Sequence, residues 1–380
     1  MIKIALVFGT RPEAIKMAPL AYALKNSKEF FVQIILSAQH RELLDQVMDL
    51  FGLDADYDLN VMEEGQTLTD ITVKVLQGLR DIWEKDKPDM VLVHGDTTTT
   101  FSASLSAFYY KIPIGHVEAG LRTYNKYQPY PEEMNRHLTG VLADIHFAPT
   151  KSAKVNLIKE NIPEDKIFVT GNTVIDAFLF VYKNLGDFKP SEVPILDGKK
   201  MILITSHRRE NWGDPMKNIA LALKDLLDKF EDIYIVFPMH PNPLIRDAFS
   251  PILGSHERVF IIPPVDYRTM VYLISNSYLV LTDSGGIQEE APSIGKPVLV
   301  LRDVTERPEA VRAGTVKLVG TSREKIVEEV SNLIMNKEMY EKMSNAVNPY
   351  GDGRASERIV QALRYYFKLS DKLPDEFKGE

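Results

Sequence analysis

The feature that most constrains the fold is a series of short Val- and Ile-rich runs separated by longer stretches with helical periodicity. The first five runs are "KIALVF" (3–8), "VQIILS" (32–37), "DMVLVHG" (89–95), "IPIGHVE" (112–118) and "DIHFAP" (144–149). Strands that are apolar along their length and alternate with helices are typical of parallel sheets covered on both faces. We therefore expect the first half of the chain to form a doubly wound α/β domain.

The same pattern begins again after residue 199. The second series comprises "MILITSH" (201–207), "IYIVFPMH" (233–240), "RVFIIPP" (258–264), "YLVLTDS" (278–284) and "PVLVLR" (297–302). A length of 380 residues suits two domains. The sequence thus predicts an α/β protein with two doubly wound, Rossmann-like domains facing a cleft. The boundary is expected between residues 169 and 194, since 188–200 has the Pro, Ser and Gly content of a connector.

Charge and composition exclude several classes of protein. A net charge of −8 argues against a general nucleic-acid binder. The absence of cysteine excludes thiol nucleophiles, thiolate metal sites and disulfides. The N-terminus runs directly into a strand pattern without the features of a signal peptide, and no apolar run reaches the ~18 residues of a membrane span. We therefore expect a cytoplasmic protein that binds neither nucleic acid nor membrane.

Ligands of open parallel sheets bind beyond the carboxyl ends of the strands, so the residues after each predicted strand are the site candidates. Five of the eight histidines occupy such positions: His40, His94, His116, His207 and His240. Two facing domains would direct these groups into one cleft.

The strongest single motif is "SGGIQEEAP" (284–292), which follows a predicted strand. Ser284 is expected to cap a helix, and Gly285 and Gly286 would let a pyrophosphate approach bare backbone N–H groups. Glu290 would accept hydrogen bonds from ribose hydroxyls. The alternative is a plain capping motif with glutamates that suit the helix dipole.

A second anion site is expected at "FGTRPEAIKMAP" (8–19), where Arg11 and Lys16 flank the first turn of a helix. The alternative is a solvated helix start. "SHRREN" (206–211) adds His207 and two arginines that suit a pyrophosphate leaving group, unless they form a salt-bridged surface loop.

Carboxylates gather in three stretches of the first domain. "VHGDTTTT" (93–100), "HVEAGLRT" (116–123) and "PYPEEMNRH" (129–137) supply Asp96, Glu118, Glu132, Glu133, Arg122 and Arg136. Several carboxylates near strand ends indicate proton transfer, with groups on two faces of a substrate. Two alternatives stay open. Asp96 and Glu132 would cap helices, or His94, Asp96, His116 and Glu118 would bind a metal, although their spacing matches no recognised ligand set.

Together "FGTRPEAIKMAP", "HGDTTTT", "HVEAGLRT", "PEEMNRH", "SHRREN" and "TDSGGIQEEAPSIGKPVLVLRDVTERPEA" resemble the non-hydrolysing UDP-N-acetylglucosamine 2-epimerase family, from about residue 4 to 360. The resemblance implies the GT-B arrangement, with domains 1–170 and 171–355 and the final helix, 356–370, packing back on the first domain. It implies reversible conversion of UDP-GlcNAc to UDP-ManNAc, by elimination of UDP to 2-acetamidoglucal and re-addition. Neither cofactor nor metal is expected.

The resemblance also assigns residues and partners. It implies catalytic roles for Asp96, Glu118, Glu132 and His207. It implies substrate binding by Arg11, Lys16, Arg136, Tyr267, Ser284, Gly285, Gly286, Glu290 and Arg307. In bacterial relatives a second substrate molecule acts as an activator, which implies roles for Gln39, Gln66, Arg209 and His240. A homodimer and a role in polysaccharide biosynthesis are implied too. Which carboxylate serves which face of C2 is left open.

Three other functions fit parts of the pattern. A GT-B glycosyltransferase would also expel UDP from a UDP-sugar, and a hydrolysing epimerase would release free ManNAc. A catalytically idle sensor would bind the nucleotide sugar and report through a partner. The complete set of carboxylates favours an enzyme over the sensor.

Overall fold

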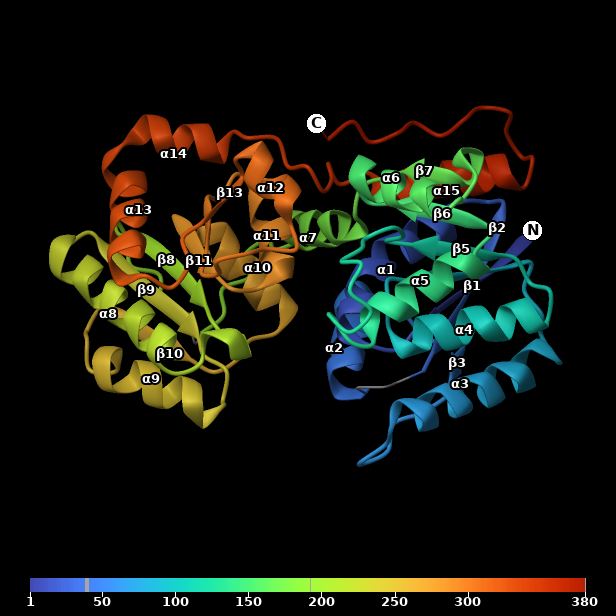
Figure 1. Ribbon diagram of the computed structural model, residues 1–380, viewed down its shortest axis with the longest axis horizontal. Helices are drawn as coiled ribbons and strands as arrows, with labels where there is room; N and C mark the ends of the chain where they lie inside the picture. Colours follow the sequence, from blue (N-terminus) through green and yellow to red (C-terminus); the bar gives the residue numbers. More distant parts are fainter. Residues whose placement is uncertain (38–40, 192, 380) are drawn as a thin grey trace. The chain divides into compact units, whose positions relative to one another are not determined.

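The computed structural model describes residues 1–37, 41–191 and 193–379 and contains two parallel sheets (Figure 1). The first sheet has the order β3-β2-β1-β4-β5-β6-β7 and consists of β1 (Ile2–Phe8), β2 (Phe30–Leu36), β3 (Tyr57–Asp58), β4 (Met90–His94), β5 (Ile114–Val117), β6 (Ile145–Ala148) and β7 (Ile167–Val169). The second has the order β10-β9-β8-β11-β12-β13 and consists of β8 (Lys200–Thr205), β9 (Ile233–Pro238), β10 (Val259–Ile262), β11 (Leu279–Thr282), β12 (Val298–Val300) and β13 (Val316–Leu318).

The predicted fold class is confirmed, and each predicted strand is present with bounds shifted by a few residues. The strands β3, β7 and β13 were not predicted. Each contains only two or three residues, which is too short to form a recognisable apolar run.

The chain divides into two compact units, called unit 1 (1–177 and 350–379) and unit 2 (178–349). The helix α7 (Thr173–Lys183) begins in unit 1 and ends in unit 2. After residue 349 the chain returns to unit 1, where α15 (Ala355–Tyr366) contacts α1. No helix in the described part of the chain is long and apolar enough to cross a bilayer.

Two groups of helices pack on the sheet of unit 1. Its remaining helical elements are α1 (Arg11–Lys25), α2 (Arg41–Phe51), α3 (Leu68–Trp83), α4 (Thr98–Tyr109), α5 (Glu132–Leu142), α6 (Lys151–Lys159) and the short 3₁₀ turn η1 (Glu164–Lys166). α4 contacts α3 and α5, whereas α1 contacts α2 and α15. Buried side chains such as Val91, Val93 and Leu79 join the sheet to α3 and α4. This core fixes the strand ends from which the site residues project.

Unit 2 follows the same plan. Its helical elements are η2 (Arg209–Asn211), α8 (Asp214–Lys229), α9 (Pro243–Leu253), α10 (Tyr267–Asn276), α11 (Gly285–Glu290), η3 (Ala291–Ile294), α12 (Pro308–Ala313), α13 (Arg323–Met335) and α14 (Lys337–Ser344). α8 contacts α9 and α13 over a core that includes Ile204, Phe237 and Leu281.

The order of each sheet reverses beside its first strand. β1 lies between β2 and β4, and β8 lies between β9 and β11. Connections that leave two such neighbours diverge to opposite faces, which opens a crevice at the carboxyl edge of the sheet. The residues that follow β1, β4, β8 and β11 are therefore placed for ligand binding.

Candidate active site

Glu118 is the centre of a buried polar cluster in unit 1. It follows β5, is 6% exposed, and its Oε2 pairs with Lys16 Nζ of α1. The same oxygen accepts a hydrogen bond from Asn172 Nδ2 (3.0 Å). The backbone φ of Glu118 is +59°, a left-handed conformation that is uncommon for a residue with a side chain. Such strain persists only where surrounding contacts hold it, which is a frequent property of functional sites.

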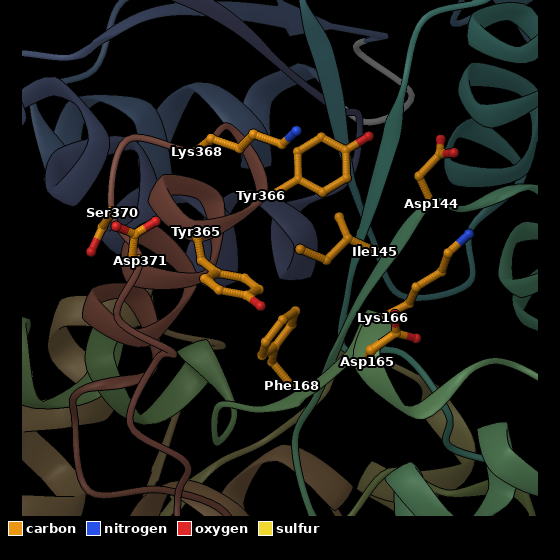
Figure 2. Close-up of a pocket in the computed structure, with 10 residues that line it drawn as sticks. All are labelled: Asp144, Ile145, Asp165, Lys166, Phe168, Tyr365, Tyr366, Lys368, Ser370 and Asp371. Carbon is orange, nitrogen blue, oxygen red and sulfur yellow. The ribbon is translucent and has the colours of Figure 1, made fainter.

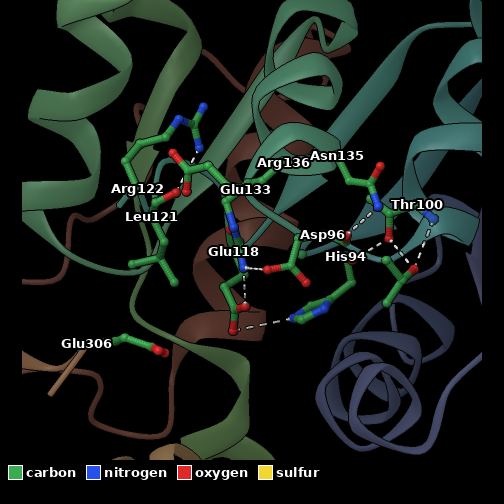
Figure 3. A network of polar contacts seen from close by, with 12 residues as sticks. His94, Asp96, Thr100, Glu118, Leu121, Arg122, Glu133, Asn135, Arg136 and Glu306 are labelled. Carbon is green, nitrogen blue, oxygen red and sulfur yellow. Dashed lines mark hydrogen bonds and ion pairs between the residues drawn. The ribbon is translucent and has the colours of Figure 1, made fainter. Parts of the chain in front are cut away.

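Arg136, on α5, joins Glu118 to Asp96 (Figure 3). Its guanidinium pairs with Asp96 Oδ2, donates to the Glu118 carbonyl oxygen, and lies 3.3 Å from Glu118 Oε1. Asn135 Nδ2 donates to the backbone oxygen of Asp96 (3.0 Å). The structure therefore brings Lys16, Asp96, Glu118 and Arg136 together.

The cluster keeps Glu118 negatively charged. Burial raises the pKa of the Glu118 carboxyl, but the charges of Lys16 and Arg136 outweigh it, and the pKa lies well below its usual value. His94 Nε2 lies 3.7 Å from Glu118 Oε2. Burial nevertheless lowers the pKa of His94 to about 3, so the ring is neutral at pH 7. The cationic partners of Glu118 at neutral pH are thus Lys16 and Arg136.

The capping alternative for Asp96 is wrong. Thr97 is the N-cap of α4, and its hydroxyl accepts from Thr100 N (3.1 Å). Glu132 is the first residue of α5, one turn before Arg136, and Pro131 takes the N-cap position. Among the described residues the buried Oε2 of Glu132 has no hydrogen-bond partner.

Two further expectations for unit 1 were a metal site and a position for Arg11 at the start of a helix. The ranges 1–37, 41–191 and 193–379 contain no group of three or more His, Cys, Asp or Glu side chains placed to hold a metal. His116 Nε2 instead lies 2.7 Å from the backbone oxygen of Gly95. Arg11 is the first residue of α1, as expected for a group at the start of the helix.

Glu13 is a buried carboxylate that sequence reasoning missed. Its Oε2 accepts from Thr10 N (2.8 Å), and its Oε1 accepts from the hydroxyls of Thr97 (2.7 Å) and Thr100 (3.1 Å). Burial raises its pKa. Glu13 thus links the loop after β1 to the loop after β4. From the sequence, Glu13 is recognisable only as the partner of Thr10 in a capping box, and the structure contains that capping box as well.

In unit 2, His207 follows β8 and faces Asp283. Its Nδ1 lies 3.3 Å from Asp283 Oδ1, and its side chain is 46% exposed. The fully buried Asp283 also accepts from the backbone N–H groups of His207 (2.8 Å) and Arg208 (2.9 Å). Burial lowers the pKa of His207, Arg208 acts in the same direction, and Asp283 opposes them. A carboxylate that contacts one ring nitrogen of a histidine fixes the ring and thereby orients the second ring nitrogen for proton transfer.

The two adjacent glutamates of α11 have different partners. Glu289 pairs with Arg307, whereas Glu290 accepts from the Tyr267 hydroxyl (2.9 Å). Ser284 is the N-cap residue, but the expectation of a capping hydroxyl is wrong, because its side chain makes no cap hydrogen bond.

A Cβ at Gly285 would lie 3.6 Å from a terminal nitrogen of Arg307 and 4.0 Å from one of Arg208. A Cβ at Gly286 would lie 3.9 Å from Glu290 Oε2. The start of α11 therefore lies beside two guanidinium groups and one carboxylate.

The residues implied for the activator have local contacts. Gln66 Oε1 accepts from Glu63 N (3.0 Å), and His240 Nδ1 accepts from Asn242 N (3.2 Å). The Arg209 guanidinium lies 5.9 Å from the Trp212 ring centre. Gln39 lies outside the described residues.

A separate cavity of about 580 Å³ lies in unit 1 (Figure 2). Phe168, Tyr365 and Tyr366 line it together with Asp144 and Lys166. Asp144 precedes β6 and Lys166 precedes β7, so this cavity is at the amino ends of the strands. It is therefore distinct from the cluster around Glu118, which follows the carboxyl ends.

Comparison with known proteins gives consistent matches over nearly the whole chain. Residues 22–364 match the family model for UDP-N-acetylglucosamine 2-epimerase. A UDP-N-acetylglucosamine 2-epimerase of Escherichia coli O157:H7 is 55% identical over 370 residues, which cover 96% of this chain and 98% of the relative. The UDP-N-acetylglucosamine 2-epimerase of Bacillus subtilis (strain 168) is 52% identical over 382 residues, which cover 100% of this chain and 99% of the relative.

The matches extend to solved structures. The crystal structure of UDP-GlcNAc 2-epimerase from Neisseria meningitidis bound to UDP-GlcNAc is similar with a TM-score of 0.86 and 54% identity. The match covers 95% of this chain and 99% of that one.

Proposed function

The chain belongs to the UDP-N-acetylglucosamine 2-epimerase family, and we infer that it is an isomerase that inverts C2 of UDP-GlcNAc to give UDP-ManNAc. The observation that carries this inference is the match of residues 22–364 to the family model. The UDP-GlcNAc bound in the Neisseria meningitidis relative supports the same substrate.

We propose an elimination and re-addition of UDP. The hydrogen on C2 is not acidic in the intact sugar, so the C1–O bond must break first or nearly so. The electrons of that bond leave with UDP, and the positive charge at C1 acidifies the C2 hydrogen. Loss of the C2 proton forms the C1=C2 double bond of 2-acetamidoglucal. A proton then returns from the opposite face, and UDP adds back to C1.

Proton transfer is assigned to unit 1. Inversion needs groups on both faces of C2, and Asp96, Glu118 and Glu132 are the candidates. The contacts of Glu118 with Lys16 and Arg136 support this role, because they hold its carboxylate ionised and fixed. Arg136 also fixes Asp96, so a single guanidinium orients two candidates.

The leaving group is assigned to unit 2. Gly285 and Gly286, with Ser284, would present backbone N–H groups to the diphosphate, and Arg307 would neutralise its charge. Glu290, oriented by Tyr267, would bind the ribose hydroxyls. His207, held by Asp283, would stabilise the departing phosphate oxygen.

Incubation with UDP-GlcNAc in D₂O tests this function. Epimerisation by elimination places one deuterium at C2 of UDP-ManNAc, which mass spectrometry and proton NMR detect. Free ManNAc would identify a hydrolysing epimerase, and transfer without elimination would leave the C2 hydrogen in place. Product that retains the original C2 hydrogen would contradict the mechanism. The variant Asp96→Asn, whose side chain is nearly the same size, serves as the inactive control.

We further propose a homodimer. Large apolar side chains are exposed at the end of α4 (Phe108, 56%; Tyr109, 65%) and on the adjacent α5 (Val141, 67%). A patch of this kind is typical of a surface that another chain covers. Light scattering should give twice the mass of one chain, and Val141→Glu should lower that mass. A monomeric wild type would contradict the proposal.

Substrate activation and a cytoplasmic location complete the proposal. Initial rates from UDP-ManNAc should rise when a small amount of UDP-GlcNAc is added, and His240→Ala should reduce that increase. If added UDP-GlcNAc leaves the initial rate from UDP-ManNAc unchanged, the substrate does not act as an activator. Fractionation of producing cells should place the protein with the cytosolic fraction.

A further inference from the structure

Asn172 connects Glu118 to the segments that link the two units. It lies directly before α7 and is 2% exposed. Its side-chain Nδ2 donates to Glu118 Oε2 (3.0 Å), and its Oδ1 accepts from Val174 N (3.1 Å). Its backbone N–H donates to the Tyr350 carbonyl (2.7 Å).

The chemistry of these partners fixes how the Asn172 amide is turned. The backbone N–H of Val174 is a donor, so the acceptor end of the amide must face α7. The NH₂ end then necessarily faces the Glu118 carboxylate. Because a side chain that caps a helix in this way has little freedom, its hydrogen bond holds Glu118 in one orientation.

Asn172 is also an uncharged hydrogen-bond donor to Glu118. Lys16 approaches from α1, Arg136 from α5 and His94 from β4, and Asp96 is joined through Arg136. Lys16 and Asn172 share the same carboxylate oxygen. Asn172 therefore supplies a donor to Oε2 without adding a positive charge.

The location of Asn172 in the chain adds a second property. α7 carries the chain out of unit 1, and Tyr350 is the first residue after its return. The Asn172–Tyr350 hydrogen bond thus joins both linking segments within unit 1. A change in the direction of α7 would act directly on the amide that holds Glu118.

We propose that Asn172 is a positioning residue for the epimerisation, which orients the Glu118 carboxylate and ties that orientation to α7 and to the segment that returns at Tyr350. This inference rests on the proposed function.

Two variants separate the contact with Glu118 from the contact with α7. Asn172→Ser keeps a good N-cap for α7 but removes the donor to Glu118. Asn172→Asp keeps the size and the cap but places a second anion beside Glu118. The matched control is Asn336→Asp, because Asn336 is an exposed N-cap of α14 whose side chain accepts from Met339 N.

The expected effects differ between the variants. Losing a hydrogen bond to a charged group should lower kcat of Asn172→Ser about tenfold or more, with a smaller change in KM. In Asn172→Asp the added anion disfavours the ionised form of Glu118, so the acid limb of the kcat–pH profile should move to higher pH. Asn336→Asp should behave as the wild type. Thermal unfolding and UDP binding, measured on each variant, report the folded fraction.

Two results would overturn the inference: a wild-type kcat and pH profile in both Asn172 variants, or a loss of activity that matches the loss of folded protein. Failure of the proposed function gives a different result, because the wild type would then place no deuterium at C2 of the nucleotide sugar.

Discussion

At the scale of single residues, the two glutamates at the end of α11 show how neighbours in sequence acquire different tasks. Glu289 is 2% exposed and pairs with Arg307, so it balances a cation close to the start of the same helix. Glu290 is 7% exposed and is held by the Tyr267 hydroxyl. One carboxylate is thus engaged with a guanidinium, and the other accepts a hydrogen bond from a neutral hydroxyl.

The first prediction concerns Tyr267. Tyr267→Phe removes the hydroxyl that holds Glu290 and should weaken UDP binding about tenfold, the usual effect of losing a hydrogen bond to a charged group. Isothermal titration calorimetry with UDP measures the change. The control is Tyr278→Phe, which removes a hydroxyl that donates to Leu333 O elsewhere in unit 2. An unchanged Kd in Tyr267→Phe would exclude this role for the hydroxyl.

The second prediction concerns Asp283. Asp283→Asn removes the charge that faces His207 Nδ1 and should lower kcat about a hundredfold, the order of effect of disabling an acid–base group. Steady-state rates of UDP-GlcNAc epimerisation provide the measurement. Asp232→Asn is the control, since Asp232 pairs with Lys200. A kcat of Asp283→Asn within twofold of the wild type would show that His207 needs no carboxylate.

The sequence indicated those site residues that lie in recognisable motifs directly after strands. Lys16, Asp96, Glu118 and Arg136 were all expected in the site, and the structure places them in contact. Asn172, Glu13 and Asp283 were not singled out, because their roles depend on partners far away in the chain. Glu118, for example, is 54 residues from Asn172. The catalytic and binding roles of all these site residues stay predictions until the variants are measured.

At the scale of elements, α15 begins against a carboxylate from another helix. Asp176 of α7 accepts from the backbone N–H groups of Ala355 (3.1 Å) and Ser356 (2.8 Å), the first residues of α15. These N–H groups have no partner within the helix, so Asp176 supplies a cap from outside. Burial raises the pKa of Asp176 to about 6 even though these hydrogen bonds lower it.

The third prediction follows from that pKa. A carboxyl whose pKa is raised in the folded state prefers its protonated form there, so folding gains stability as pH falls from above 6 toward 3.8 and loses it as pH rises. Relative to Asp176→Asn, the wild type should be more stable at pH 4.5 than at pH 7.5, by about 2 kcal/mol. Urea unfolding at a series of pH values measures the difference.

The exposed Asp54 provides the control for this measurement. The same pH series is run on Asp54→Asn, which removes an exposed carboxyl. If the difference between the wild type and Asp176→Asn is independent of pH, Asp176 does not carry the linkage.

Element types were predictable where the apolar runs were long. β1 and β8 are buried along almost their whole length, and continuous hydrophobicity marked them in the sequence. β3 has only two residues and is held by pairing with β2, a long-range contact that local sequence does not reveal. The hydroxyl of Ser284 was expected to cap α11 but does not, because residue type alone does not fix a rotamer.

At the scale of the whole molecule, unit 1 is assembled from both ends of the chain and unit 2 from the middle. The contact of α15 with α1 joins the last long helix to the first. The domain limits 1–170 and 171–355 stay a prediction, since compact units defined by contacts are no test of which segments fold together.

The fourth prediction concerns proteolysis between α7 and β8. Lys199 is exposed directly before β8, so trypsin should cut after it first, whereas the bond after Lys189 leads into Pro190 and resists trypsin. The nicked protein should elute as one species, because the second fragment carries α15, which packs on α1 of the first. Denaturing gels and native gel filtration measure cutting and association. Fragments that separate under native conditions would contradict the expectation, and Lys199→Ala is the control that should resist the first cut.

The late return of the chain to unit 1 has a consequence for biosynthesis. A ribosome releases α15 only after every residue of unit 2. The nascent polypeptide can therefore complete unit 2 while α1 still exposes the surface that α15 later covers. Premature termination within unit 2 would leave that surface bare, so truncated products should be substrates for chaperones and quality-control proteases.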